Sequence, residues 1–148
     1  MRSYLACPSI NPNDSFERQS LDQPERGRIL LVEDDQAVRG LVGRFLCHKG
    51  YQVTEAQNGL HALEIIAETN LAFQLVLTDV MMPGMGGVDL VNHLRAHSIR
   101  CAVIFMTGYY DIELPLNQES MVLHKPFKLQ TLLELVHRAI DSDQAITA

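Results

Sequence analysis

Short apolar runs alternate with longer amphipathic patterns along most of the chain. Continuous apolar runs, which are typical of strands buried on both faces of a sheet, lie at 29–32, 75–77 and 101–106, with a shorter run at 121–123. Residues 51–56 instead alternate apolar and polar side chains, which indicates a strand with one covered face or an edge position. The pattern therefore predicts five strands.

Segments with helical periodicity separate these strands. The first has apolar residues three and four positions apart and ends at Gly50, a residue type common at helix C-termini; its apolar face is Val38, Leu41, Val42, Phe45 and Leu46. Asn58 is placed to cap a helix that runs to about Thr69, and another is expected from about Gly86 to Ala96. A last amphipathic helix carries Leu129, Leu132, Leu133, Val136 and Ile140.

Strands that alternate with helices predict an α/β fold with a parallel sheet and helices on both faces. The fully apolar runs belong in the middle of that sheet, and 51–56 belongs towards its edge. Residues 1–26 carry three prolines among polar residues and show no apolar periodicity, which is typical of a flexible tail. We therefore expect one folded domain over 27–143 and a short C-terminal tail over 144–148.

Composition and charge narrow the classes of partner. The 148 residues are 47% hydrophobic and carry a net charge of −6, and no Lys or Arg occurs from Cys101 to His124. Binding to a phosphate backbone needs clustered basic residues, so direct contact with nucleic acid is not expected. The chain shows no apolar stretch long enough to span a membrane and no apolar core of a signal peptide. The expectation is a cytoplasmic protein without a membrane contact.

Polar residues that interrupt the apolar pattern lie at the ends of four predicted strands. The acidic run 33–35 follows the first strand, Asp79 the third, Thr107 the fourth and Lys125 the fifth. In a doubly wound sheet, ligands bind at the carboxyl ends of the strands. Crowded carboxylates need a cation among them, and oxygen ligands without His or Cys favour Mg²⁺. A carboxylate, a hydroxyl and an ammonium beside Mg²⁺ are the groups that phosphoryl transfer requires.

Each of these residues also has an ordinary structural explanation. An acidic run is common at a helix N-terminus, Asp79 precedes a turn at Pro83-Gly84, and Thr107 and Lys125 could be a strand-end hydroxyl and a surface lysine. Five of the six histidines lie in predicted helical segments with no shared metal spacing, and the strand alternation should point His124 away from Lys125. We assign none of the six to catalysis. Only the joint placement at successive strand ends makes phosphoryl chemistry the favoured hypothesis.

Four blocks of this sequence resemble the signature blocks of response-regulator receiver domains: Leu30-Leu31-Val32-Glu33-Asp34-Asp35, Leu77-Thr78-Asp79-Val80-Met81-Met82-Pro83-Gly84, Met106-Thr107-Gly108 and Lys125-Pro126-Phe127. The resemblance spans about Arg28 to Ile140. It implies a flavodoxin-like (βα)5 fold with strand order 2-1-3-4-5, and a phosphoryl donor that is a histidine kinase or a histidine phosphotransfer protein.

The resemblance also implies a role for each site residue. Asp79 would be the phosphoacceptor, and Thr107 and Lys125 would contact the phosphoryl group. Asp34 and Asp79 would bind Mg²⁺ directly, Glu33 through water, and Met81 through its carbonyl group. The family pattern further implies a cis peptide bond between Lys125 and Pro126.

Two features depart from the family pattern. The position three residues before the lysine usually holds Tyr or Phe, and here it is Val122. The stretch from Thr107 to Lys125 is short for the family and contains Pro115, which breaks helices. We therefore expect a fourth helix that is shortened, disordered or absent. Such a compressed form resembles receivers associated with hybrid sensor kinases.

The prediction is a phosphorylatable signalling switch, a monomer or weak dimer, that catalyses only its own phosphorylation and dephosphorylation. Two alternatives stay open at this point. A degenerate receiver would act as a scaffold without phosphorylation, and an aspartate-nucleophile phosphatase would turn over phosphate esters. The second usually carries another Asp two residues after the nucleophile, where this chain has Met81.

Overall fold

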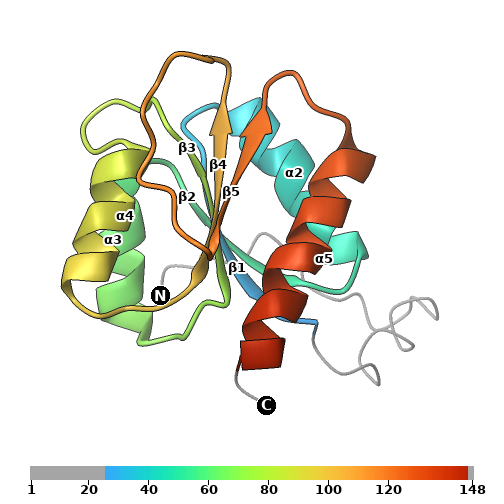
Figure 1. Ribbon diagram of the computed structural model, residues 1–148, viewed down its shortest axis with the longest axis horizontal. Coiled ribbons are helices and arrows are strands. Elements are labelled where there is room, and N and C mark those ends of the chain that lie inside the picture. The colour runs from blue at the N-terminus through green and yellow to red at the C-terminus, as the bar shows by residue number, and fades with distance from the viewer. Residues whose placement is uncertain (1–25, 147–148) are drawn as a thin grey trace.

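A parallel sheet of five strands forms the centre of the computed structural model, which describes residues 26–146 (Figure 1). The strand order is β2-β1-β3-β4-β5, as expected for a flavodoxin-like fold. In chain order the elements are β1 (Arg28–Val32), α2 (Gln36–His48), β2 (Gln52–Ala56), α3 (Gly59–Thr69), β3 (Leu75–Asp79), α4 (Gly87–Ala96), β4 (Ala102–Thr107), β5 (Ser120–His124) and α5 (Leu129–Ile146).

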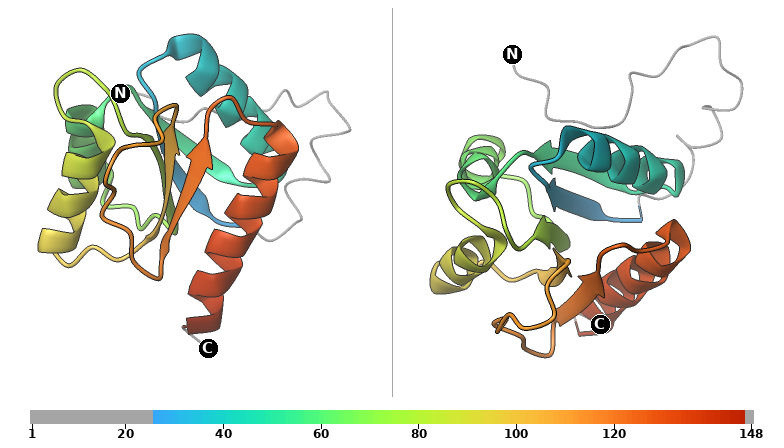
Figure 2. Two further views of the ribbon diagram at one scale, coloured as in Figure 1. Left: turned by 45° about the horizontal axis from the view of Figure 1, so that its top comes forward. Right: turned by 90° about the horizontal axis from the view of Figure 1, so that it is seen from above.

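Helices cover both faces of the sheet, with α2 and α5 on one side and α3 and α4 on the other (Figure 2). One core cluster joins the sheet to α2 and α5, and includes Ile29, Leu46 and Leu132; a second joins it to α3 and α4, and includes Leu30 and Leu90. The strands β1, β3 and β4 are buried along nearly their whole length. Their continuous apolar runs therefore follow from burial on both faces, and the alternating segment 51–56 does lie at an edge, in β2.

Local signals set the helix ends close to their predicted positions. Asn58 caps α3, because its Oδ1 accepts a hydrogen bond from the backbone N–H of His61 at 2.8 Å. Gly50 follows the end of α2 with φ of +97°, a conformation that L residues rarely adopt. Helix α5 extends to Ile146, three residues beyond the predicted domain end at 143. The predicted N-terminal tail, except for Arg26, and residues 147–148 lie outside the described residues.

The connection between β4 and β5, residues 108–119, contains no helix, as the short spacing and Pro115 predicted. It runs along the α4 side of the sheet (Figure 1), where Ile112 and Leu114 pack against the second core cluster. The guanidinium of Arg95, on α4, donates one hydrogen bond to the Pro115 carbonyl and another to Ser120 Oγ at 2.9 Å. Arg100 adds an ion pair with Glu119 at 2.9 Å. The loop is therefore fixed by apolar contacts and by two arginines in place of helical hydrogen bonds.

No helix within residues 26–146 is long and apolar enough to cross a membrane.

Candidate functional site

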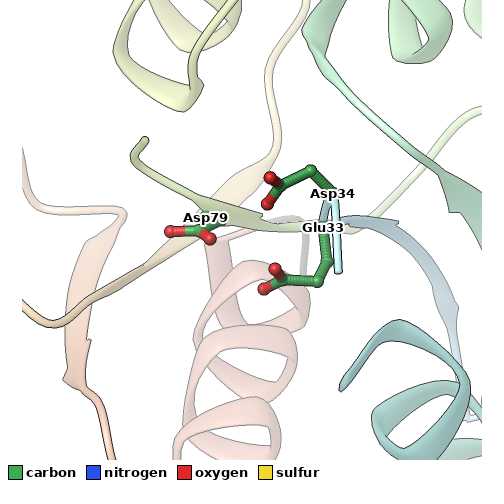
Figure 3. A group of neighbouring side chains, drawn as sticks. All are labelled: Glu33, Asp34 and Asp79. Atoms are coloured by element: carbon green, nitrogen blue, oxygen red, sulfur yellow. The ribbon is translucent and has the colours of Figure 1, made fainter. Parts of the chain in front are cut away.

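Three carboxylates meet at the carboxyl ends of β1 and β3. Glu33 and Asp34 directly follow β1, and Asp79 is the last residue of β3. Because β1 and β3 are parallel neighbours, these strand ends lie side by side. One carboxylate oxygen from each residue lies within 4.8 Å of the other two, and Figure 3 shows the three groups facing one another. The sequence prediction of an acidic cluster formed from separate strand ends is confirmed.

Lys125 reaches this cluster from the end of β5. Its Nζ lies 3.0 Å from Glu33 Oε2 and 3.0 Å from Asp79 Oδ2, so one ammonium bridges two carboxylates. The backbone N–H of Lys125 donates to the Thr107 carbonyl at 2.8 Å, and the Lys125–Pro126 peptide is cis, as expected. Three carboxylates and one ammonium leave a net charge of −2 when all four groups are ionised.

Burial and neighbouring charges both shift the pKa values of Glu33 and Lys125. Glu33 is 1% exposed, and burial raises the pKa of its carboxyl to about 7, with the Asp79 charge adding to the rise and Lys125 opposing it. Burial alone would lower the pKa of Lys125, but its hydrogen bonds with Glu33 and Asp79 outweigh burial and raise it. The lysine therefore stays protonated, while Glu33 can exchange a proton near neutral pH.

Asp35, the third member of the acidic run, has a structural task. Its Oδ1 accepts hydrogen bonds from the backbone N–H groups of Ala37 at 2.9 Å and Val38 at 3.1 Å, which makes it the N-cap of α2. This separates Asp35 from the acidic pair Glu33 and Asp34. The ordinary explanation for an acidic run thus holds for one of its three residues.

Close packing also fixes the backbone of Asp79. Helix α4 begins at Gly87, and a Cβ atom at that position would overlap the carbonyl oxygen of Asp79. The N–H of Val80 donates to the Met106 carbonyl at 3.1 Å, and the N–H of Gly87 donates to the Val80 carbonyl at 3.0 Å. The strand end that carries Asp79 is therefore held by β4 on one side and by α4 on the other.

Two predicted site residues make no contact of this kind with the carboxylates in the structure. Thr107 is buried at the end of β4, but its Oγ1 accepts a hydrogen bond from the backbone N–H of Tyr109 at 3.0 Å. Met81 has a side chain that is 58% exposed; its predicted role concerns its carbonyl group. For both residues the predicted contacts with ligand stay predictions.

Sequence reasoning assigned no role to Arg39, which supports the site from α2. Its Nη1 donates a hydrogen bond to the carbonyl of Glu33 at 2.8 Å, and so holds the loop that presents Glu33 and Asp34. The sequence did contain a signal for this role: Arg39 lies in the second turn of a helix that starts beside an acidic loop. A side chain at that position points back towards the helix N-terminus.

Comparison with known proteins identifies the family. Residues 29–137 match the response regulator receiver domain. This chain belongs to that family.

Several relatives are receivers or contain one. The response regulator receiver protein CpdR of Brucella abortus is 33% identical over 117 residues, which cover 76% of this chain and 96% of CpdR. Sporulation initiation phosphotransferase F of Bacillus subtilis is 33% identical over 75% of this chain and 91% of its own length. The crystal structure of the receiver domain of the hybrid histidine kinase CckA is 37% identical, with a TM-score of 0.68, over 77% of this chain and 99% of that domain.

Other relatives are much longer than this chain. It spans 22% of a cyclic di-GMP phosphodiesterase of Thermotoga maritima and 12% of the sensor kinase CckA of Brucella abortus. The similarity to CckA agrees with the predicted resemblance to receivers of hybrid sensor kinases. The receiver assignment is a signalling role, and the comparisons favour it over the phosphatase considered above.

Proposed function

We propose that Asp79 accepts a phosphoryl group from a phosphohistidine donor. The observation that carries this assignment is the contact between Asp79 Oδ2 and Lys125 Nζ at 3.0 Å, at the edge of the sheet where β1 and β3 end. Asp79 is 8% exposed, so its carboxylate is fixed in place, yet it can still be reached from solvent. A fixed carboxylate beside a cation suits nucleophilic attack on phosphorus, because positioning and charge neutralisation dominate phosphoryl transfer.

The residues present fit Mg²⁺. Carboxylate oxygens are the hard ligands that this ion prefers, and the net charge of −2 at the site calls for a divalent cation. Asp34 and Asp79 would bind it directly, Glu33 through water, and Met81 through its carbonyl group. When bound, Mg²⁺ would neutralise charge on the phosphoryl oxygens and reduce the repulsion between Asp79 and its acidic neighbours.

The transfer breaks the N–P bond of the donor phosphohistidine and forms a bond between phosphorus and a carboxylate oxygen of Asp79. The donor imidazole leaves with its electron pair and is then protonated from solvent. Lys125 would move from bridging two carboxylates to contacting a phosphoryl oxygen, and the Thr107 hydroxyl would donate to another. The proposed donor is a histidine kinase or a histidine phosphotransfer protein. The chain would work in the cytoplasm. It would switch protein contacts and would not turn over a separate substrate.

A mass measurement tests the proposal. Incubation with a small phosphodonor and Mg²⁺ should add one phosphoryl group to the intact chain, and Asp79→Asn should abolish the adduct. Asp89→Asn, at an exposed position of α4, is the matched control and should label like the wild type. An undiminished adduct on Asp79→Asn would place the acceptor elsewhere, and no adduct on the wild type with Mg²⁺ would support the scaffold alternative.

A further inference from the structure

Two histidines form an exposed pair at the C-terminal end of α4. His93 and His97 are four positions apart, the spacing that places two side chains on the same face of a helix. Their rings are stacked, with centroids 4.2 Å apart and planes tilted by 24°. Both residues are exposed. The receiver function described above gives this pair no task.

A hydrogen bond fixes the proton position on one of the rings. His97 Nδ1 lies 2.8 Å from the backbone carbonyl oxygen of His93. A carbonyl oxygen can only accept, so Nδ1 of His97 carries the proton, and its Nε2 holds a free lone pair whenever the ring is neutral. A ring nitrogen bonded to a backbone carbonyl, with the other nitrogen available, is the arrangement that orients metal-binding histidines.

We propose that His93 and His97 together bind a late first-row divalent metal ion such as Zn²⁺. Imidazole nitrogen suits Zn²⁺, Ni²⁺ and Cu²⁺ and is a poor ligand for Mg²⁺. For one nitrogen of each ring to face the same ion, the rings must turn out of their stacked arrangement, and the exposed positions four residues apart on one helix face permit that rotation. The pair is exposed, so water can fill the remaining coordination positions. His97 is also the C-cap of α4, and a cation is favoured at the C-terminal end of a helix.

This site is separate from the acidic cluster. Helix α4 starts at Gly87 beside the Asp79 backbone and extends about 15 Å for its ten residues. The histidine pair therefore lies towards the other end of the sheet, where the strands begin. The last turn of α4 also carries Arg95, which holds the 108–119 loop. A metal bound there would stabilise the turn from which that loop is anchored.

Calorimetric titration with Zn²⁺ tests the proposal on the full chain. Excess Mg²⁺ is present throughout to compete with Zn²⁺ for the carboxylate cluster. Replacing one direct ligand should cost at least the roughly 10–100-fold that loss of an outer-shell partner costs. We therefore expect His93→Gln and His97→Gln each to weaken Zn²⁺ binding by about tenfold or more, and the double variant to abolish it. His48→Gln, at an exposed residue in the last turn of α2, is the matched control and should bind like the wild type.

NMR spectroscopy can identify the nitrogen atoms that bind Zn²⁺. Two-dimensional spectra of the ¹⁵N-labelled imidazoles should show Zn²⁺ shifting Nε2 of His97 and one nitrogen of His93, while the other histidines stay unchanged. Because both positions are exposed, the variants should fold normally, and phosphorylation of Asp79 should be unaffected. The proposal is overturned if the double variant binds Zn²⁺ as tightly as the wild type, if the wild type binds none, or if the imidazole shifts fall on other histidines.

Discussion

Removal of the Lys125 ammonium isolates the electrostatic balance of the site. Lys125→Met keeps the length and much of the apolar stem of the side chain but removes the charge. Without Mg²⁺, the variant leaves Glu33 and Asp79 facing each other with no bridging cation. Hydrogen bonds to charged groups contribute about 1.5–3 kcal/mol each, and breaking a buried ion pair costs about 3–5 kcal/mol.

Two features of the structure reduce the loss of stability expected from these interaction energies. The Lys125 side chain is 29% exposed, so water screens part of the interaction, and Glu33 can take up a proton because burial already raises its pKa to about 7. We therefore expect a loss of about 2–3 kcal/mol in the free energy of unfolding at pH 8 without Mg²⁺.

The loss in the free energy of unfolding caused by Lys125→Met should depend on pH and on Mg²⁺ in a defined direction. The pKa of Glu33 is higher in the folded chain than in the unfolded chain. The free energy of unfolding therefore falls as the pH rises from the unfolded-state pKa of Glu33 through its folded-state pKa. Without Lys125 that folded pKa moves higher still, since a contact that lowered it is gone. The stability difference between wild type and Lys125→Met should thus be larger at pH 8 than at pH 6. Added Mg²⁺ should reduce it, because a divalent cation replaces the lost charge.

Urea unfolding at both pH values, with and without Mg²⁺, measures these differences. Lys128→Met is the matched control: Lys128 is exposed, so its replacement should change stability by no more than about 0.5 kcal/mol. Equal losses for the two variants at pH 8 without Mg²⁺, or a loss that Mg²⁺ does not reduce, would refute the view that Lys125 neutralises the carboxylates.

Three further predictions concern the proposed metal ligands and the β4–β5 connection. Asp34→Ala should weaken Mg²⁺ binding strongly and Glu33→Ala less, because a direct ligand matters more than a water-bridged one; a Mg²⁺ titration with equal losses would contradict these roles. Mg²⁺ affinity of the wild type should fall about tenfold from pH 8 to pH 6, because the ion competes with protonation of Glu33, and Glu33→Gln should flatten that slope. Hydrogen exchange in 108–119 should differ with and without a beryllofluoride phosphoryl mimic, while β2 serves as the internal reference; identical protection of the loop in both states would exclude it as the responding segment.

The arrangement of the fold was predictable because local pattern and burial agree. Continuous apolar runs mark strands covered on both faces, Asn58 caps the helix that follows it, and Pro115 lies where a helix would otherwise form. The convergence of Glu33, Asp34, Asp79 and Lys125 followed from one rule, that the carboxyl ends of parallel strands share an edge.

Side-chain contacts between distant segments were not predictable in the same way. Nothing in the sequence says that Arg95 of α4 donates to the Pro115 carbonyl, since that contact depends on the path of a loop without periodicity. The rotamer of Thr107, whose hydroxyl accepts from the Tyr109 N–H, depends on the turn that follows β4. Asp35 could be either ligand or cap until the direction of its carboxylate was known.

The close approach of α4 to the Asp79 backbone has a consequence for protein engineering. Replacing helical glycines with alanine usually raises stability by about 0.5–1 kcal/mol, and α2 offers such a position at Gly40, where an added Cβ meets nothing within 4 Å. The same exchange at Gly87 would force the new methyl group into the Asp79 carbonyl oxygen. A stabilisation protocol that treats helical glycines alike would therefore strengthen the scaffold at one position and displace Asp79, the proposed phosphoacceptor, at the other. For this chain, designs of that kind should be screened by phosphorylation as well as by melting temperature.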